Sequence, residues 1–245
     1  DEQLNDRGAV AVARAAAAAG VTHFMFRSSV KALGPAPGPT PRGESDGLPP
    51  SDGYGRAKAA AERALEGLAA DSGMAVTVLR PALIYGPGAR GNVDLLCRWV
   101  SAGRPAPPPV GARSLVSRDD LVQLLLTVAA KPAAGYRCWN VTDGDRYTAR
   151  RLCEALARAQ GRALAGPVLP VWAWRAAAAA RDLLRGERPG QTAAALLGWD
   201  CYRNDAVRTA TGWLPRYRFE DVAPALVAAR AAGGADARAT EGAGR

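Results

Sequence analysis

Apolar residues recur along this chain with two different periods, and these periods predict an alternation of helices and strands. Alanine and leucine at helical spacing predict helices over residues 5–19 and 53–72. Unbroken apolar runs, rich in β-branched and aromatic residues, predict buried strands over residues 21–29, 75–80 and 136–141. This order of elements is typical of an α/β fold with a parallel sheet.

Shorter elements are predicted further along. Arg113 begins a short strand, and helices are predicted from residues 91–93 onward and over 119–130, 148–160, 167–185, 204–211 and 219–230. The first of these helices carries an apolar stripe expected to face the core, made of Leu95, Leu96, Trp99 and Val100. Asp119 and Asp120 are the expected cap of the next. The helix over 167–185 is amphipathic; it could pack on its own domain, pair with a partner or lie on a membrane surface, and packing is favoured.

Composition and charge exclude several classes of protein. The formal net charge is +9, but the arginines are spread along the chain without interleaved aromatic residues, so no nucleic-acid partner is predicted. The four cysteines (Cys97, Cys138, Cys153, Cys201) contain no Cys-x-x-Cys, which predicts a reduced, cytoplasmic compartment and no structural metal. His23 is the only histidine, which excludes a histidine-based triad. No apolar run reaches about 18 residues, so no membrane-spanning segment is expected.

Tyr54 and Lys58 are the strongest candidates for chemistry. They lie four residues apart near the start of a predicted helix whose expected N-cap is Asp52, so both side chains fall on one helix face. An ammonium group beside a phenol favours the phenolate, which can act as a base at neutral pH. Lys58 is also one of only three lysines among 32 basic residues, and so stands out from an arginine-rich background.

Ser28 and Ser29 supply two hydroxyl groups at the end of the predicted strand over 21–29. In an open parallel sheet, ligands bind at the edge formed by the carboxyl ends of the strands. Residues 30–52, which follow, are rich in proline, glycine and aspartate and predict an irregular loop over this edge. Loops of that length without structure of their own are usually functional.

The residues from Phe24 to Gly34, followed by Tyr54-x-x-x-Lys58, resemble the extended short-chain dehydrogenase/reductases, in particular the NAD-dependent epimerases and dehydratases of nucleotide sugars. Three later segments are similar to family motifs in the same order: Leu79 to Gly88, Arg113 to Leu121, and Gly212 to Pro215. The resemblance covers about residues 1–230. The family's glycine-rich loop, which holds a pyrophosphate at a helix N-terminus, is absent, so the chain is expected to be an N-terminally truncated fragment whose own cofactor binding is in doubt.

The resemblance implies roles for the residues around Tyr54. Tyr54 would move the proton of a sugar hydroxyl, Ser29 would hydrogen-bond the same oxygen, and Lys58 would hold the nicotinamide ribose. Further contacts with the cofactor, NAD or NADP, are implied for Asn5, Ser28 and Pro81. By itself, Asn5 is equally well explained as a helix cap.

Substrate binding is implied for Tyr85, Asn92 and Arg113. The Arg113 guanidinium is a forked donor suited to phosphate oxygens, although a surface arginine is the plain alternative. Asn92 would contact a nucleotide diphosphate or serve as an N-cap, and Tyr85 is either a pocket wall or a packing residue. Leu83 stands where nucleotide-sugar enzymes of the family often carry asparagine. A leucine at this position is similar to family members with a more apolar pocket.

Pattern and resemblance together predict an α/β fold made of the C-terminal half of a doubly wound, Rossmann-type parallel sheet and a smaller α/β substrate lobe. Residues 1–90 are expected to form a partial NAD(P)-binding domain that carries the serine, tyrosine and lysine. Residues 91–231 are expected to be mainly the substrate-binding lobe, with some elements returning to the sheet. Residues 232–245 are expected to be a disordered tail.

The expected activity is that of an NAD(P)-dependent epimerase, dehydratase or 4-keto reductase acting on a nucleotide-activated sugar. One alternative is an oxidoreductase of small ketones, similar to the 3β-hydroxysteroid dehydrogenases. Another is a truncated, non-catalytic binding module. A homodimer is an open alternative to a monomer.

Overall fold

The computed structural model describes the backbone of residues 2–88, 92–164 and 169–242. It describes the side chains of the same residues except 2–6, 92 and 233–242. The chain divides into two compact units and passes through each of them three times. The first unit consists of Asp1–Leu83, Ser114–Gly144 and Asp200–Arg216, and the second of Ile84–Arg113, Asp145–Trp199 and Tyr217–Arg245. The predicted division into a cofactor domain over 1–90 and a substrate lobe over 91–231 stays a prediction.

A parallel sheet of three strands lies at the centre of the first unit, in the order β1 (His23–Arg27), β2 (Ala75–Pro81) and β6 (Tyr136–Val141). Arg27 pairs with Leu79, and Pro81 pairs with Val141, so the three strands end at the same edge. The strand after Gly20 is shorter than the predicted range of 21–29, because Val21 is exposed and Ser29 already caps the next element. The predicted doubly wound α/β fold class is confirmed.

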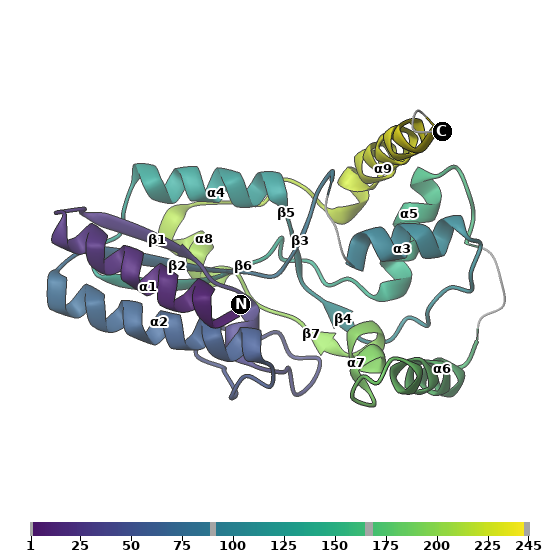
Figure 1. Ribbon diagram of the computed structural model, residues 1–245, viewed down its shortest axis with the longest axis horizontal. Coiled ribbons are helices and arrows are strands. Elements are labelled where there is room, and N and C mark those ends of the chain that lie inside the picture. The colour runs from purple at the N-terminus through teal and green to yellow at the C-terminus, as the bar shows by residue number, and fades with distance from the viewer. Residues whose placement is uncertain (1, 89–91, 165–168, 243–245) are drawn as a thin grey trace. The chain divides into compact units, whose positions relative to one another are not determined.

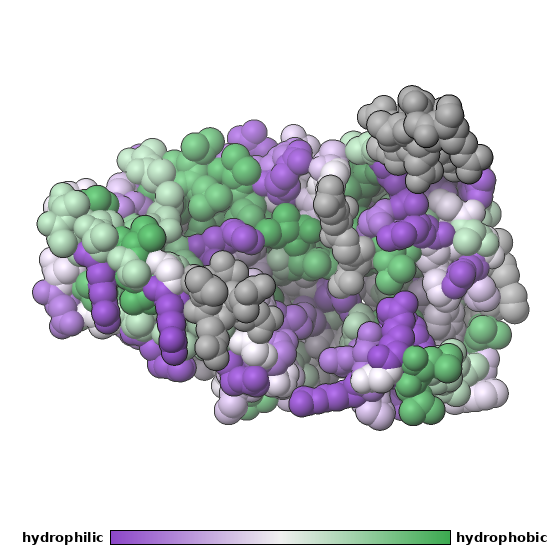
Figure 2. Space-filling model, viewed as in Figure 1, coloured by the Kyte–Doolittle hydropathy of each residue, from purple (hydrophilic) through white to green (hydrophobic). Residues whose placement is uncertain are grey.

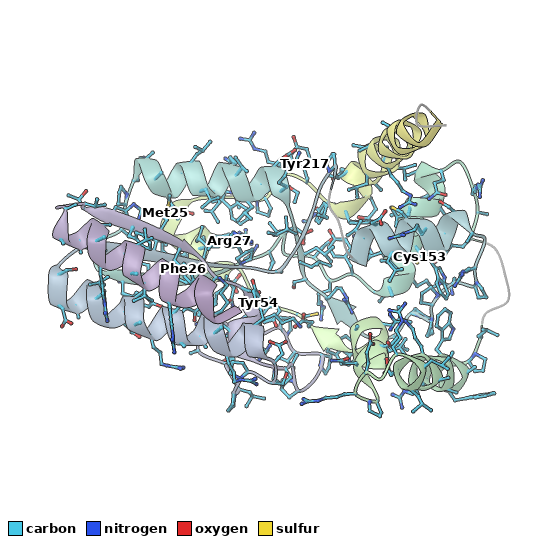
Figure 3. The ribbon with its side chains drawn as sticks, in the orientation of Figure 1. Met25, Phe26, Arg27, Tyr54, Cys153 and Tyr217 are labelled. Carbon is cyan, nitrogen blue, oxygen red and sulfur yellow. The ribbon has the colours of Figure 1, made fainter. Side chains whose placement is uncertain are left out.

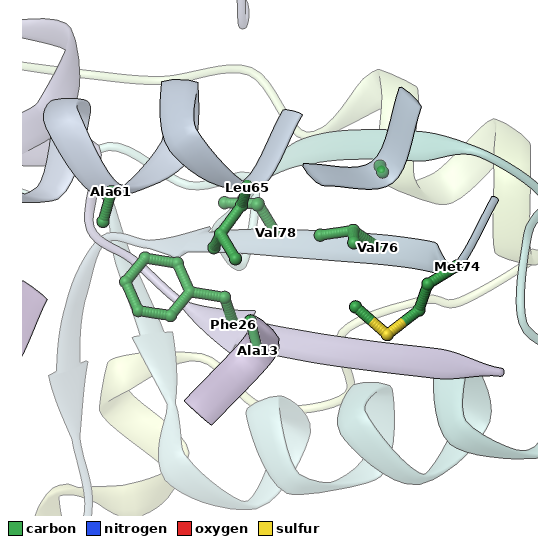
Figure 4. Close-up of a cluster of buried hydrophobic side chains, with 8 residues drawn as sticks. Ala13, Phe26, Ala61, Leu65, Met74, Val76 and Val78 are labelled. Carbon is green, nitrogen blue, oxygen red and sulfur yellow. The ribbon is translucent and has the colours of Figure 1, made fainter. Parts of the chain in front are cut away.

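Helices cover both faces of this sheet (Figure 1). On one face lie α1 (Glu2–Ala18) and α2 (Gly53–Ser72), and on the other lies α4 (Arg118–Ala130). The core between α1, α2 and the strands is built from Ala13, Phe26, Ala61, Leu65, Ala69, Met74, Val76 and Val78, most of which Figure 4 labels. The small alanine side chains let both helices approach the sheet closely, while Phe26 and Leu65 fill the space between them.

The helix that carries Tyr54 begins and ends as predicted. The Asp52 carboxylate accepts a hydrogen bond from the Gly55 amide at 2.6 Å, which satisfies one of the unpaired donors at the helix start. Gly73, with a φ of 71°, ends the helix in the left-handed conformation that glycine adopts without steric cost.

The predicted cap of α4, Asp119 and Asp120, lies two to three residues too late in the chain. Ser117 is the N-cap, and its hydroxyl oxygen accepts from the Asp120 amide at 3.0 Å. Asp120 lies inside the first turn, where its carboxylate receives hydrogen bonds from the Ser117 hydroxyl at 2.9 Å and from the Arg216 amide at 3.0 Å. Asp120 is buried, so these bonds replace the water that an exposed carboxylate would hold.

The remaining elements are divided between the two units. The first unit also contains the 3₁₀ helix η1 (Val30–Leu33), the strand β5 (Leu115–Ser117) and the helix α8 (Asp205–Thr211). The second unit contains α3 (Asn92–Ser101), β4 (Ala112–Arg113), α5 (Ala149–Ala159), α6 (Val171–Leu184), α7 (Gln191–Leu197) and α9 (Phe219–Gly242). A unit boundary falls inside each of the strands β3 (Leu83–Tyr85) and β7 (Trp199–Asp200), directly after the first residue of the strand.

Two predictions for the second unit differ from the structure. In α3, Val100 of the predicted stripe is buried and Leu96 and Trp99 are half-buried, but Leu95 is 52% exposed. Val93 and Cys97, which the predicted stripe left out, are buried. The predicted disordered tail over 232–245 is helical as far as Gly242, because α9 continues through a segment whose alanines have the highest helix propensity. Among the described residues, no helix is both long and apolar enough to cross a membrane.

Candidate active site

Tyr54 and Lys58 lie in the first two turns of α2. Figure 3 labels Tyr54 near the edge where the strands of the sheet end. The Lys58 ammonium nitrogen is 5.7 Å from the centre of the Tyr54 ring and 4.7 Å from the centre of the Phe26 ring on β1. At these distances a cation is attracted to the face of an aromatic ring. Phe26 and Tyr54 therefore hold the ammonium beside the phenol, while Tyr54 itself remains 39% exposed to solvent.

Ser29 lies two residues after the end of β1 and caps η1. Its side-chain oxygen accepts a hydrogen bond from the Lys31 amide at 3.2 Å, and Ser29 is half-buried. The first turn of α2 lies close against this element: a Cβ atom added at Gly55 would sit 2.5 Å from the Lys31 carbonyl oxygen. Gly55, next to Tyr54, is thus in contact with Lys31, two residues after Ser29. Tyr54 and Ser29 therefore lie on two elements that touch each other.

Ser28 is turned away from this surface and is buried. Its hydroxyl donates to the Glu62 carboxylate at 2.5 Å, and Glu62 also accepts two hydrogen bonds from the Arg80 guanidinium, at 2.9 and 2.6 Å. Glu62 is only 4% exposed. The predicted contact of Ser28 with a cofactor stays a prediction, and the structure gives its hydroxyl a role in joining α2 to the ends of β1 and β2.

The charged pair at the centre of this network is well satisfied. Burial works against the charged form of the Arg80 guanidinium, but its hydrogen bonds with Glu62 and the charge interactions with Glu62, Cys138 and Tyr136 together outweigh burial and raise the pKa of Arg80 above its usual value. Arg80 also donates to the Glu44 carbonyl at 3.0 Å, and the Glu44 carboxylate accepts from the Asn140 amide on β6 at 2.9 Å. One network therefore joins α2, two strands and the loop that follows η1.

Sequence reasoning missed Glu62, Arg80 and Glu44. Glu62 lies four residues after Lys58 and eight after Tyr54, on the same helix face, and this spacing is the signal that could have found it. Nothing in the sequence around Glu44 distinguishes it from other loop carboxylates.

The predicted loop over residues 30–52 is fastened by a buried arginine that was also missed. The Arg42 guanidinium, 4% exposed, donates to the carbonyl oxygens of Leu33 at 2.9 Å and Gly34 at 2.7 Å and to the Tyr202 hydroxyl at 2.9 Å. Its carbon lies 5.0 Å from the centre of the Tyr202 ring. The loop is therefore anchored to the first unit beside Ser29.

Pro81 and Asn5 complete the predicted group in the first unit. Pro81 is the buried last residue of β2, level with Val141, and so lies at the same sheet edge as Ser29. Asn5 lies inside α1, which begins at Glu2, so the helix-cap alternative for Asn5 is wrong. The Asn5 side chain is outside the described residues.

The three predicted substrate residues lie in the second unit. Tyr85 is fully buried, its hydroxyl donates to the Tyr217 carbonyl at 3.1 Å, and its ring packs edge-on against Phe219 at 5.3 Å. Arg113 is half-buried on β4, exchanges backbone hydrogen bonds with Tyr147 at 3.0 and 2.9 Å, and donates from its side chain to the Ala195 carbonyl on α7. Asn92 is the first residue of α3, and its side chain is outside the described residues.

Comparison with known proteins identifies the family. The model of the NAD-dependent epimerase/dehydratase family matches residues 3–142, more than half of the chain and the whole of the sheet with its Tyr54 helix. The chain belongs to the NAD-dependent epimerase/dehydratase family. The predicted resemblance is thereby confirmed.

The relatives of this epimerase/dehydratase chain include characterised nucleotide-sugar enzymes. A UDP-glucose 4-epimerase of Vibrio cholerae is 35% identical over 177 residues, which cover 71% of this chain and 54% of that protein. The chain thus spans about half the length of the curated relatives it matches.

Solved structures share the fold. A UDP-glucose 4-epimerase from Thermotoga maritima, solved with UDP-glucose, has a TM-score of 0.74 at 23% identity and covers 95% of this chain and 71% of its own. The Bordetella bronchiseptica enzyme WbmG, solved with NAD and UDP, has a TM-score of 0.71 at 21% identity and covers 93% of this chain and 66% of its own.

Proposed function

We propose that the protein containing this chain is an NAD(P)-dependent epimerase, dehydratase or 4-keto reductase of a nucleotide-activated sugar. The observation that carries the proposal is the position of the Lys58 ammonium, 5.7 Å from the centre of the Tyr54 ring. Both residues lie on α2, whose first turn touches η1, the element that Ser29 caps. An exposed phenol, a hydroxyl and an ammonium then stand at the carboxyl edge of one parallel sheet, where α/β proteins of this type bind their ligands.

The roles of the three groups follow from their chemistry. Tyr54 takes the proton of a sugar hydroxyl or returns it, and the positive charge of Lys58 stabilises the phenolate that forms. Ser29 donates a hydrogen bond to the same sugar oxygen and keeps it in line with the phenol. Glu62 and Arg80 do not touch the substrate in this proposal. They fix the rotation of α2 about its axis, and with it the direction in which Tyr54 points.

The same donor set fits the nicotinamide end of NAD or NADP. The Lys58 ammonium and the hydroxyl groups of Ser29 and Tyr54 are donors of the kind that ribose hydroxyls and the carboxamide require. When bound, the nicotinamide supplies a hydride acceptor and donor next to the carbon whose hydroxyl loses its proton. The NAD-bound Bordetella bronchiseptica relative supports this assignment, and the choice between NAD and NADP stays open.

Substrate binding is proposed to rest on Arg113, with Asn92 and Tyr85 as further candidates in the second unit. The Arg113 guanidinium donates to the Ala195 carbonyl, which orients the planar group. A guanidinium with a fixed orientation is well suited to the oxygens of a diphosphate. The similar structures from Thermotoga maritima, solved with UDP-glucose, and from Bordetella bronchiseptica, solved with NAD and UDP, support a nucleotide diphosphate as the ligand class.

The deciding experiment incubates the full-length protein and NAD with UDP-sugars, dTDP-sugars and a neutral cyclic ketone, and follows the products by proton NMR. We expect a change at C4 of a nucleotide sugar, seen as an epimer or a 4-keto product, and no turnover of the ketone. Turnover of the ketone alone would move the small-ketone oxidoreductase ahead, an alternative that Leu83 favours. Absence of both NAD binding and turnover in the folded protein would support the non-catalytic binding module.

A further inference from the structure

An apolar stripe of α6 faces solvent. Trp172 is 72% exposed, Leu183 77% and Leu184 88%. These three are among the most exposed large apolar residues that the structure describes. Counted from Trp172, the leucines lie at positions i+11 and i+12, and the exposed Ala176, Ala179 and Ala180 lie between them at i+4, i+7 and i+8. In a helix these positions form one continuous face.

The opposite face of α6 is the packed one. Trp174, Ala178 and Asp182 are buried, and the Trp174 ring lies 5.7 Å from the Trp99 ring of α3. The Asp182 carboxylate accepts hydrogen bonds from the Thr192 amide at 3.2 Å, which tie α6 to α7. The helix is therefore held in place by one side, and its apolar stripe is not needed for that packing.

The border of the stripe is positive. The segment from 170 to 190 carries four arginines (Arg175, Arg181, Arg185, Arg188) against two acids, Asp182 and Glu187. Asp182 is buried and bonded to Thr192, and Glu187 lies 3.6 Å from Arg181 and 4.0 Å from Arg185. The solvent side of α6 thus presents tryptophan and leucine bordered by guanidinium groups. Figure 2 shows hydrophobic residues beside strongly hydrophilic ones in the region of α6.

We propose that α6 lies flat on an anionic lipid bilayer, with Trp172, Leu183 and Leu184 at the boundary between headgroups and acyl chains. An exposed apolar helix face that carries tryptophan and leucine and is bordered by arginine is the pattern of interfacial helices. Charge decides against a second copy of this chain as the occupant. Four arginines against two acids leave the segment from 170 to 190 with a net charge of +2. If two copies of the stripe faced each other, both of these positive segments would meet at one contact, whereas anionic headgroups neutralise them.

The test measures binding of the purified protein to vesicles of phosphatidylcholine alone and of phosphatidylcholine with 30% phosphatidylglycerol, by flotation. We expect at least about 10-fold stronger binding to the anionic vesicles, and weaker binding when salt is raised from 0.1 to 0.5 M. The double substitution Leu183→Ser/Leu184→Ser should reduce anionic-vesicle binding at least about 10-fold. The matched control is Val122→Ser/Leu126→Ser on α4, where residues 48% and 67% exposed are changed without effect on binding.

A second measurement does not depend on those variants. Lipids brominated near the headgroup should quench part of the tryptophan fluorescence of the bound protein, and Trp172→Phe should remove that part. The proposal is overturned if the protein fails to bind anionic vesicles, or if Leu183→Ser/Leu184→Ser binds them as the unchanged protein does. It is also overturned if the double variant converts a dimer to a monomer in size-exclusion chromatography, because the stripe would then be covered by a second copy.

Discussion

Gly55 and Lys31 are in backbone contact: a Cβ atom at position 55 would lie 2.5 Å from the Lys31 carbonyl oxygen, closer than such atoms approach each other in proteins. Gly55→Ala should push the first turn of α2 away from η1 and shift Tyr54 relative to Ser29. We expect a loss of stability of about 1–3 kcal/mol, as for other overpacked sites, together with a lower kcat.

Gly67, on the same helix, provides the matched control for Gly55. It is exposed, and an added Cβ meets no atom within 4 Å. Gly67→Ala should therefore stabilise the protein by about 0.5–1 kcal/mol through the lower backbone entropy of alanine in the unfolded chain, without changing kcat. Equal effects of the two substitutions in urea unfolding and in turnover would contradict the proposed role of the contact.

Glu62→Gln should be strongly destabilising. The substitution leaves the Arg80 guanidinium, whose side chain is 12% exposed, without the carboxylate that accepts two of its hydrogen bonds. Breaking a buried ion pair from one side costs about 3–5 kcal/mol. Glu66→Gln, one turn further along at an exposed position, should change the free energy of unfolding by less than about 0.5 kcal/mol. A Glu62→Gln protein as stable as the Glu66→Gln control would show that the network is not needed to hold α2.

Tyr54→Phe in the full-length protein should lower kcat by about 100-fold or more, the usual worth of a positioned acid or base, and leave NAD affinity unchanged. Tyr217→Phe is the matched control, since Tyr217 is exposed to a similar degree, 42% against 39%. Turnover and calorimetric NAD binding are measured on both variants. Near-normal turnover of Tyr54→Phe would remove this residue from the proposed chemistry.

Arg113→Ala should raise KM for a UDP- or dTDP-sugar by at least about 10-fold, because one charge-assisted contact worth about 1.5–3 kcal/mol is lost. Turnover of a neutral ketone, if any is found, should stay the same. Arg63→Ala, an exposed arginine of α2, controls for the general loss of positive charge. An unchanged KM for the nucleotide sugar would count against a diphosphate contact by Arg113.

The buried thiols predict how stability depends on pH. Burial raises the pKa of Cys153, on α5 (Figure 3), to about 12 and that of Cys138 on β6 to about 12. An unfolded thiol loses its proton near pH 8.5, so above that pH only the unfolded state ionises and gains stability. The free energy of unfolding should therefore fall by about 1.4 kcal/mol per pH unit for each such thiol between pH 8.5 and 12.

Urea unfolding at pH 7.5, 9 and 10 measures this slope. Cys153→Ala should lower the free energy of unfolding at every pH through the lost packing. Above pH 8.5 it should also make the decrease of the free energy of unfolding with pH less steep, by about 1.4 kcal/mol per pH unit. A parallel downward shift with an unchanged slope would show that Cys153 does not titrate in this way.

The sequence predicts the part of the site that is local in the chain. Asp52, Tyr54 and Lys58 lie within seven residues, and helix geometry alone places two of them on one face and the third at the cap. Arg42 could not be found in this way, since its partner Tyr202 lies 160 residues away and no short pattern links them. The fold, like the site, is most predictable where the determining contacts are close in sequence.

Periodicity predicts that a segment is helical more reliably than it predicts which side is buried. In α3 the apolar residues surround more than half of the helix, so the stripe through Leu95 and the stripe through Val93 and Cys97 are equally consistent with the spacing. Tertiary packing selects the second stripe. The prediction of the α4 cap failed for a similar reason. Ser117, Asp119 and Asp120 are all good cap residues, and which of them is the N-cap depends on the Arg216 amide that donates to Asp120.

The position of Lys58 against the Phe26 ring should give its side chain a distinctive NMR chemical shift. The sequence holds three lysines, so reductive methylation with ¹³C-formaldehyde would give three side-chain signals in a carbon–proton NMR spectrum. The ring current above Phe26, whose centre is 4.7 Å from the Lys58 nitrogen, should displace one of these signals upfield and identify it without sequential assignment. That single resonance would report directly on dinucleotide and substrate entering the site, in titrations that require neither turnover nor a variant.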